Sequence, residues 1–235
     1  WIQTLRDESK KELFAVGEYW STDVNRLHRY ITETEGKISL FDVPLHYNLF
    51  NASNDPNYNM SQILEHTLVK ENPCMAVTFV DNHDTQPGQA LQSFVQGWFK
   101  SIAYSIILLR NDGYPCVFYG DYYGIEHDHI EPVNDLKTLM LIRKEKSYGL
   151  QHDYFDHNNF IGWTQEGDDE HLSSGLAVVI SNAGDGYKRM YVGNQNVGET
   201  YIDCLGNCEE EVTIDEDGCG NFGVKSRSVS VWIKK

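Results

Sequence analysis

The first 149 residues alternate between short apolar runs and longer stretches with one apolar face. A short apolar run bounded by polar residues is typical of a strand buried on both faces, and apolar positions three and four residues apart are typical of a helix. Strands are predicted at residues 13–17, 38–41, 75–80 and 115–119, and helices at 24–31, 60–69, 95–109 and 135–146. Four strand–helix units predict either a small open parallel sheet or half of an eightfold barrel.

The pattern changes beyond Gly149. Five short apolar runs separated by Gly, Asn and Asp turns follow, at residues 160–163, 176–180, 190–192, 212–214 and 229–233. This spacing is typical of an antiparallel sandwich. We therefore predict two domains, residues 1–149 and 150–235. Residues 51–59, which are rich in Asn, are predicted to form a loop.

Each predicted strand of the first part is followed by an acidic residue, and these are Glu18, Asp42, Asp84 and Asp121. The carboxyl ends of parallel strands are where α/β proteins keep their chemistry, although a capping or salt-bridged loop at residues 79–85 is equally compatible with the pattern. Two facing carboxylates such as Glu18 and Asp84 are the minimum for glycoside hydrolysis. They are also common in structural networks. His83 could bind a hydroxyl ligand or simply be hydrogen-bonded within the protein.

Composition narrows the range of partners. A formal net charge of −16 argues against nucleic acid and anionic membranes as partners, and no apolar run approaches the roughly 20 residues that span a bilayer. The aromatic content of 12% suits a carbohydrate ligand, although an aromatic-rich core explains it equally well. The motifs of serine hydrolases, P-loop proteins and dinucleotide-binding proteins do not occur in the chain.

Two groups of residues have the composition of metal ligands. Residues 126–129 (EHDH) could hold a metal, but a solvated loop is the favoured interpretation. Cys204, Cys208 and Cys219 lack the usual spacing and a fourth ligand, so we expect them to be unliganded. Cys74 and Cys116 lie beside predicted core strands and are expected to be buried. The chain starts at Trp1 without Met or a signal segment, so we expect the native protein to extend further.

Residues 79–88 (FVDNHDTQPG) carry a resemblance to the α-amylases of glycoside hydrolase family 13, especially the bacterial liquefying and cytoplasmic type. Supporting stretches lie at residues 16–20, 40–47, 113–121, 152–157 and 229–232, in order along essentially the whole chain. The resemblance implies an α/β plus all-β fold, with the second half (strands 5–8) of a (β/α)8 TIM barrel followed by a C-terminal Greek-key β-sandwich.

The same resemblance implies roles for individual residues. Glu18 matches the general acid/base, and Asp84 matches the carboxylate that holds sugar hydroxyls and stabilises the transition state. The substrate-binding residues that it implies are His83, Tyr19, Trp20 and Gln86. The nucleophilic aspartate would follow a fourth strand that precedes Trp1. The implied activity is therefore endo-hydrolysis of α-1,4-glucans with retention, and the isolated 235 residues are predicted to be inactive.

The resemblance also bears on cofactors, partners and location. The main calcium ligands would lie upstream, and a second metal site would map to the backbone near Tyr58 and to Asn158, Asn159 and Asn182. Positions 158, 159 and 182 carry Asn where relatives carry His or Asp, and the loss of charge weakens the case for calcium. A half barrel would join its missing half or self-associate, since its sheet edges are open. A transglycosylase with the same residues is an alternative. The free cysteines and the likeness favour the cytoplasm, with secretion as the alternative.

Overall fold

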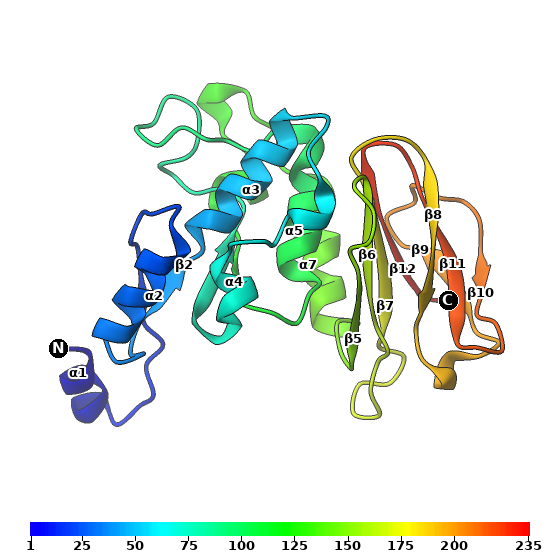
Figure 1. Cartoon of the computed structure of the whole chain (residues 1–235), viewed down its shortest axis with the longest axis horizontal. Helices are drawn as coiled ribbons and strands as arrows, with labels where there is room; N and C mark the ends of the chain where they lie inside the picture. The colour runs from blue at the N-terminus through cyan, green and yellow to red at the C-terminus, as the bar shows by residue number, and fades with distance from the viewer.

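The computed structural model describes all residues 1–235 and consists of a helix-rich part and a strand-rich part (Figure 1). The first part is built on four parallel strands in the order β1-β2-β3-β4. Their bounds are β1 (Val16–Gly17), β2 (Ser39–Phe41), β3 (Ala76–Phe79) and β4 (Tyr114–Cys116). Each strand is joined to the next by a segment with at least one helix, so the predicted strand–helix repetition is confirmed.

The helices of this part differ in length and in how they begin. They are α1 (Ile2–Ser9), α2 (Val24–Glu33), α3 (Val43–Asn54), α4 (Leu68–Glu71), α5 (Lys100–Leu108), α6 (Tyr119–Tyr123) and α7 (Leu136–Glu145), with short 3-10 turns η1 (Met60–Gln62), η2 (Pro73–Met75), η3 (Gly97–Phe99) and η4 (Glu126–Asp128). Asp23 caps α2 by accepting from the Asn25 amide, as expected from its position before the apolar stripe.

One loop prediction and one helix prediction were wrong. The segment 51–59 does not begin as a loop, because α3 extends to Asn54; the signal was Asp42, which caps this helix, with Pro44 in the first turn. The predicted helix at 60–69 is instead η1 and α4, separated by His66. The backbone of His66 lies in the left-handed region at φ 59°, which a continuous right-handed helix cannot contain.

The outer strands of the parallel sheet are shorter and less covered than predicted. Only Val16 and Gly17 of the segment 13–17 pair with β2, and the Phe14 and Val16 side chains are 60% and 43% exposed. Cys74 and Cys116, which were expected to be buried, are both exposed. Parallel strands are normally covered on both faces, so these positions lack the neighbours that would bury them.

The sheet also curls strongly. Four parallel strands spaced about 4.8 Å apart would separate β1 from β4 by about 14 Å if the sheet were flat. The rings of Phe14, just before β1, and Tyr114, on β4, nevertheless lie 5.1 Å apart between centroids. The two edges therefore bend toward each other on one side of the sheet.

The second part is antiparallel, as predicted. Its strands are β5 (Gln151–Tyr154), β6 (Phe160–Gln165), β7 (Leu176–Ser181), β8 (Gly186–Tyr191), β9 (Thr200–Asp203), β10 (Val212–Thr213), β11 (Cys219–Val224) and β12 (Ser228–Lys234), with the 3-10 turn η5 (Asn194–Asn196). Six of them form one sheet in the order β10-β9-β12-β7-β6-β5, and β8 pairs with β11. β5, β9 and β11 were not predicted, because their polar and glycine residues leave no apolar run in the sequence.

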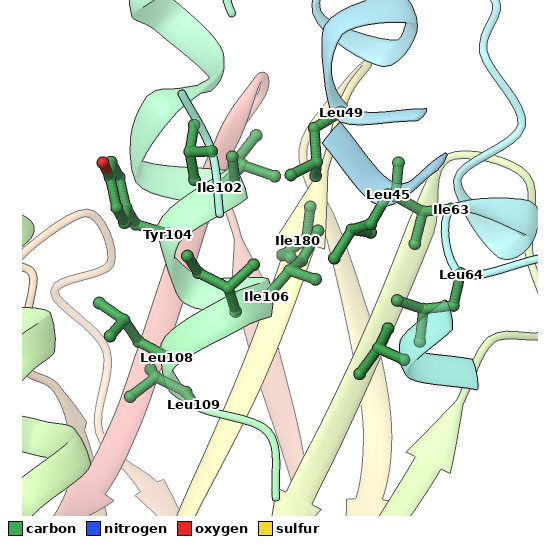
Figure 2. Close-up of a cluster of buried hydrophobic side chains, with 14 of the residues drawn as sticks. Leu45, Leu49, Ile63, Leu64, Ile102, Tyr104, Ile106, Leu108, Leu109 and Ile180 are labelled. Carbon is green, nitrogen blue, oxygen red and sulfur yellow. The ribbon is translucent and has the colours of Figure 1, made fainter. Parts of the chain in front are cut away.

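One apolar core runs through both parts. It joins residues of α3 and α5 to residues of β6, β7 and β12. Figure 2 shows Leu45 and Leu49 of α3 and Ile106 of α5 gathered around Ile180 of β7. A smaller cluster fills the space between the two antiparallel sheets. The boundary between residues 149 and 150 therefore stays a prediction, since packing is continuous across it. No helix combines the length and apolarity needed to cross a membrane.

Candidate active site

The turn after β3 is fixed by its own side chains. The Asn82 carboxamide oxygen accepts from the backbone amides of Asp84 (2.9 Å) and Thr85 (3.0 Å), and the Thr85 hydroxyl accepts from the Asn82 amide. Between these anchors the side chains of His83 and Asp84 project outward and are 76% and 39% exposed. The turn therefore presents an imidazole and a carboxylate on a rigid support, which is what a binding or catalytic pair requires.

Below the turn lies a buried charge network. Asp81 is buried and accepts from the Thr85 hydroxyl (2.7 Å), the Val95 amide (3.1 Å) and Lys100 Nζ (2.5 Å). Lys100 also donates to Asp121 Oδ1 at 2.7 Å. Burial raises the pKa of Asp81 to about 6, against the opposing effect of the Lys100 charge.

A hollow of about 760 Å³ opens beside the turn. Its lining comprises His83, Gln86, Phe118, Tyr119, Gly120, Gly124, Ile125, Glu126 and His127. The structure thus brings together two predicted site residues, His83 and Gln86, with α6 and η4 from the segment after β4. A polar rim with aromatic side chains is suited to a sugar, whose hydroxyls and C–H faces need both kinds of contact.

Glu18 directly follows β1, and its side chain is exposed. β2 lies between β1 and β3, so the ends of these two strands are about 10 Å apart at the usual spacing. Both Glu18 and Asp84 therefore lie beyond the carboxyl edge of one sheet, but not on neighbouring strands.

The aromatic residues after Glu18 differ in their surroundings. Tyr19 stacks on Tyr30 of α2, with 5.2 Å between ring centroids. Trp20 is half-buried and contacts the rings of His46 (5.9 Å) and Phe79 (6.1 Å). Trp20 therefore packs between the ends of β1 and β3, where it supports the site from below.

Asp42, which directly follows β2, and Asp121, which lies on α6 rather than at the end of β4, have structural partners. Asp42 is fully buried and accepts from the backbone amides of Leu45, Leu68 and Val69, so it caps α3 and binds the first turn of α4. Burial raises the pKa of Asp42 to about 6. Asp121 is bound by Lys100 and by the Tyr104 hydroxyl.

Sequence reasoning missed three residues next to the site: His46, Lys100 and Tyr104. The His46 ring is buried between Val80 O (2.7 Å) and the Ser93 hydroxyl (2.8 Å), and burial lowers its pKa to about 4. A signal for Lys100 existed, since a cation in the middle of the apolar stripe 95–109 cannot be left unpaired when buried.

The junction residues proposed as metal ligands bind one another instead. Asn159 donates its side-chain amide to Asn182 Oδ1 at 2.9 Å, and Asn182 donates in turn to the Tyr58 carbonyl at 2.9 Å. The Asn158 carbonyl accepts from the Met60 amide at 2.7 Å. The carbonyl oxygens of Tyr58, Asn158 and the Asn182 side chain each already accept an N–H donor, and no carboxylate is present among these residues. These residues do not fit a calcium ion.

The other metal-like residues are similarly unsuited. The segment 126–129 forms η4 and the turn after it, and no group of three or more His, Cys, Asp or Glu side chains is placed to hold a metal. Cys204 donates to Val231 O at 3.0 Å, and Cys208 lies 3.4 Å from the Ser230 hydroxyl.

Comparison with known proteins gives consistent results. Residues 176–233 match the family model described as "Alpha-amylase C-terminal". The chain is 50% identical over its whole length to an α-amylase of Geobacillus stearothermophilus, of which it covers 43%. It is 48% identical to an α-amylase of Bacillus licheniformis (100% of the chain, 47% of the relative) and 42% identical to the cytoplasmic α-amylase of Escherichia coli (99% and 49%). The chain thus spans less than half the length of these relatives.

Crystal structures of α-amylases share the fold. An Anoxybacillus α-amylase superposes with a TM-score of 0.73 at 14% identity, over 99% of this chain and 54% of that chain. An α-amylase of Geobacillus thermoleovorans complexed with acarbose gives 0.71 at 16% identity, over 100% and 56%.

Proposed function

We infer that the chain is a C-terminal portion of an α-amylase of glycoside hydrolase family 13, and we propose that it carries part of an α-glucan-hydrolysing active site. The proposed substrate is an α-1,4-linked glucan such as starch, glycogen or a maltooligosaccharide. The observation that carries the proposal is the fixed turn after β3, which presents Asp84 and His83 beside a sugar-sized hollow. We further propose that the parallel sheet is strands 5–8 of a (β/α)8 barrel, in agreement with its curl.

In the proposed mechanism Glu18 is the proton donor to the glycosidic oxygen. Its place beyond the end of β1, on the same edge as Asp84, supports this role. Asp84 and His83 would bind the hydroxyls of the sugar ring whose bond is broken, and Asp84 would stabilise the positive charge that develops there. Gln86, on the wall of the hollow, would contact the same sugar or the next one.

The attacking carboxylate of a retaining mechanism would come from outside these residues. Glu18 and Asp84 are separated by a strand, whereas the acid and nucleophile of retaining enzymes lie about 5–5.5 Å apart. We therefore propose that a half barrel preceding Trp1 supplies the nucleophile, and that the 235 residues alone are inactive. The exposed side chains of Phe14 and Val16 support a covering partner of this kind.

Starch hydrolysis tests the proposal. We expect no activity from residues 1–235 alone, and activity when the preceding half is supplied on the same chain or added separately. In the active form, Glu18→Gln and Asp84→Asn should each lower kcat by about 100-fold or more, the usual contribution of such groups. Glu12→Gln is the control, because Glu12 is an exposed carboxylate six positions before Glu18 in the sequence. Full activity of the isolated 235 residues would refute the upstream nucleophile.

Two alternatives are separable by experiment. A transglycosylase would convert maltoheptaose into longer as well as shorter products, whereas a hydrolase gives only shorter ones. Self-association of the fragment through its open sheet would appear in size-exclusion chromatography as a dimer or larger species. We propose the cytoplasm as location, on the basis of the unpaired cysteines and the cytoplasmic relative of Escherichia coli.

A further inference from the structure

Lys100 is among the most deeply buried charges in the molecule. Its side chain is 3% exposed, and its ammonium group lies between the Asp81 carboxylate (2.5 Å) and the Asp121 carboxylate (2.7 Å). The remaining side of the ammonium group lies over the Phe94 ring, 3.8 Å from its centroid. All sides of the cation are therefore occupied by protein groups, and hydration is replaced by two ion pairs and a cation–π contact.

Such an arrangement needs an explanation other than stability. Buried ion networks are often no more stabilising than an apolar cluster of the same volume, because the desolvation of each charge opposes the attraction between them. They do, however, enforce one geometry, since every partner must be in place to satisfy the others.

The two carboxylates belong to opposite sides of the hollow. Asp81 binds the Thr85 hydroxyl and the Val95 amide, and so holds both ends of the segment that carries His83, Asp84 and Gln86. Asp121 lies on α6, which follows β4 and contributes Tyr119 and Gly120 to the facing wall.

Tyr104 adds a second attachment on the α6 side. Its hydroxyl donates to Asp121 Oδ2 at 2.7 Å and accepts from the Phe118 amide at 3.4 Å. Lys100 and Tyr104 are one turn apart on α5, so a single helix holds the wall and the turn together.

We propose that Lys100 is a positioning residue, which fixes the Asp84–His83 turn relative to α6 and so sets the width of the sugar-binding hollow. This inference rests on the proposed function. Lys100 does not contact the substrate; it acts through Asp81 and the Thr85 hydroxyl on one side and through Asp121 on the other.

The test uses the complete enzyme with its N-terminal half. Lys100→Met alone leaves two facing buried carboxylates and can prevent folding, so the decisive variant is Lys100→Met combined with Asp121→Asn. This pair keeps the formal charge of the buried group at −1 and leaves the Thr85 and Val95 hydrogen bonds to Asp81 intact. We expect a folded protein with kcat lowered about 10- to 100-fold, because small displacements of catalytic groups have effects of this size. KM should change less than kcat.

Asp203→Asn is the matched control. Asp203 is a buried carboxylate that accepts from four backbone amides of the strand-rich part and is remote from the turn. Its variant should have a lower Tm and an unchanged kcat. If Lys100 has only a structural role, the double variant should likewise have a lower Tm and an unchanged kcat. A wild-type kcat in the folded double variant would therefore overturn the inference.

A crystal structure of the double variant separates this inference from the proposed function. We expect Asp84 and His83 to move relative to α6, and unchanged positions would contradict the role of Lys100 whatever the activity. Absence of glucan hydrolysis by the complete wild-type enzyme would instead refute the proposed function.

Discussion

The two parts of the chain differ in what they bury. Among Asp, Glu, Lys, Arg and His, the helix-rich part buries six side chains, Asp42, His46, Asp81, Lys100, Arg110 and Asp121, whereas the strand-rich part buries one, Asp203. All six residues of β7 are buried, while β1 and β4 have exposed side chains. The first part therefore combines costly internal charges with an incomplete cover, whereas the interior of the second part holds only one of these charges.

This difference indicates that the two parts have different structural roles. Internal charges hold the ends of strands and turns in fixed geometry, which a functional site needs and which apolar packing alone does not specify. The strand-rich part contributes a rigid apolar wall, against which α3 and α5 pack (Figure 2). The following four predictions test the contrast, from the largest expected effect to the smallest.

The pH dependence of stability should arise in the first part, and His46 is its most sensitive group. The pKa of His46 is about 4 in the folded chain, below its ordinary value of 6.5, so the unfolded chain binds more protons between these values. The contribution of His46 to stability is therefore lost as pH falls through this window, by up to about 3 kcal/mol. Asp42 and Asp81, with pKa values raised to about 6, act in the opposite direction between pH 4 and 6.

The His46→Asn variant isolates this effect, because its amide can still donate to Val80 O. We expect the free energy of unfolding of the wild type, measured in urea relative to that of the variant, to fall by up to about 3 kcal/mol between pH 6.5 and 4. Equal slopes of unfolding free energy against pH in both proteins would contradict a neutral, buried His46.

Two chemically identical truncations compare the packing of the two parts. Val178 on β7 is fully buried, whereas Val16 on β1 is 43% exposed. Val178→Ala should lower the free energy of unfolding by about 2–3 kcal/mol, through lost burial and a residual cavity. Val16→Ala should cost about 0.5 kcal/mol or less. Similar losses in the two variants would show that β1 is covered in solution, for example by a second copy of the chain.

An ion pair adds to the apolar contacts between the two parts. Arg110, at the end of α5, is buried and binds both carboxylate oxygens of Asp153 on β5, at 2.7 and 2.9 Å. Asp153→Asn should cost about 1–2 kcal/mol, since Asp153 is partly exposed and only the charge-assisted bond is lost. Asp156→Asn, which removes an exposed partner of Lys188, is the control and should have little effect. Equal costs measured by thermal unfolding would argue against a coupling role for Arg110.

Calcium removal should have the smallest effect on the junction. Because the Asn182 amide donates to the Tyr58 carbonyl, a chelator should leave the Tm of the 235-residue chain unchanged. The combined variant Asn159→Asp and Asn182→Asp introduces the missing carboxylates, and its Tm should rise with added calcium. A calcium-dependent Tm in the wild type would contradict the amide-bonded junction.

The sequence was sufficient for features encoded locally. The approximate positions of the four parallel strands, the change to antiparallel structure after residue 149 and the polar turn at 79–85 all follow from hydrophobic runs and their breaks. α3 was missed although Asp42 and Pro44 signalled a helix start, because the same acidic residue was interpreted as the functional end of a strand. One side chain can end a strand and cap a helix at once.

Features made by distant residues could not be predicted in this way. Lys100 pairs with residues 19 and 21 positions away, and the His46 ring binds atoms 34 and 47 positions away. Trp20 lies two residues after Glu18, yet its ring contacts Phe79 on β3, two strands away in the sheet. Such contacts depend on how the sheet curls, which local patterns do not encode.

The exposed thiol of Cys116 gives the molecule a built-in chemical reporter. It lies on the edge strand β4, while Cys208 in the strand-rich part is buried. An alkylating reagent should therefore modify Cys116 in the isolated chain, more slowly than a fully hydrated thiol because partial burial raises its pKa. Any strand that pairs with β4 would shield this sulfur, so protection from labelling would record completion of the sheet without reference to catalysis.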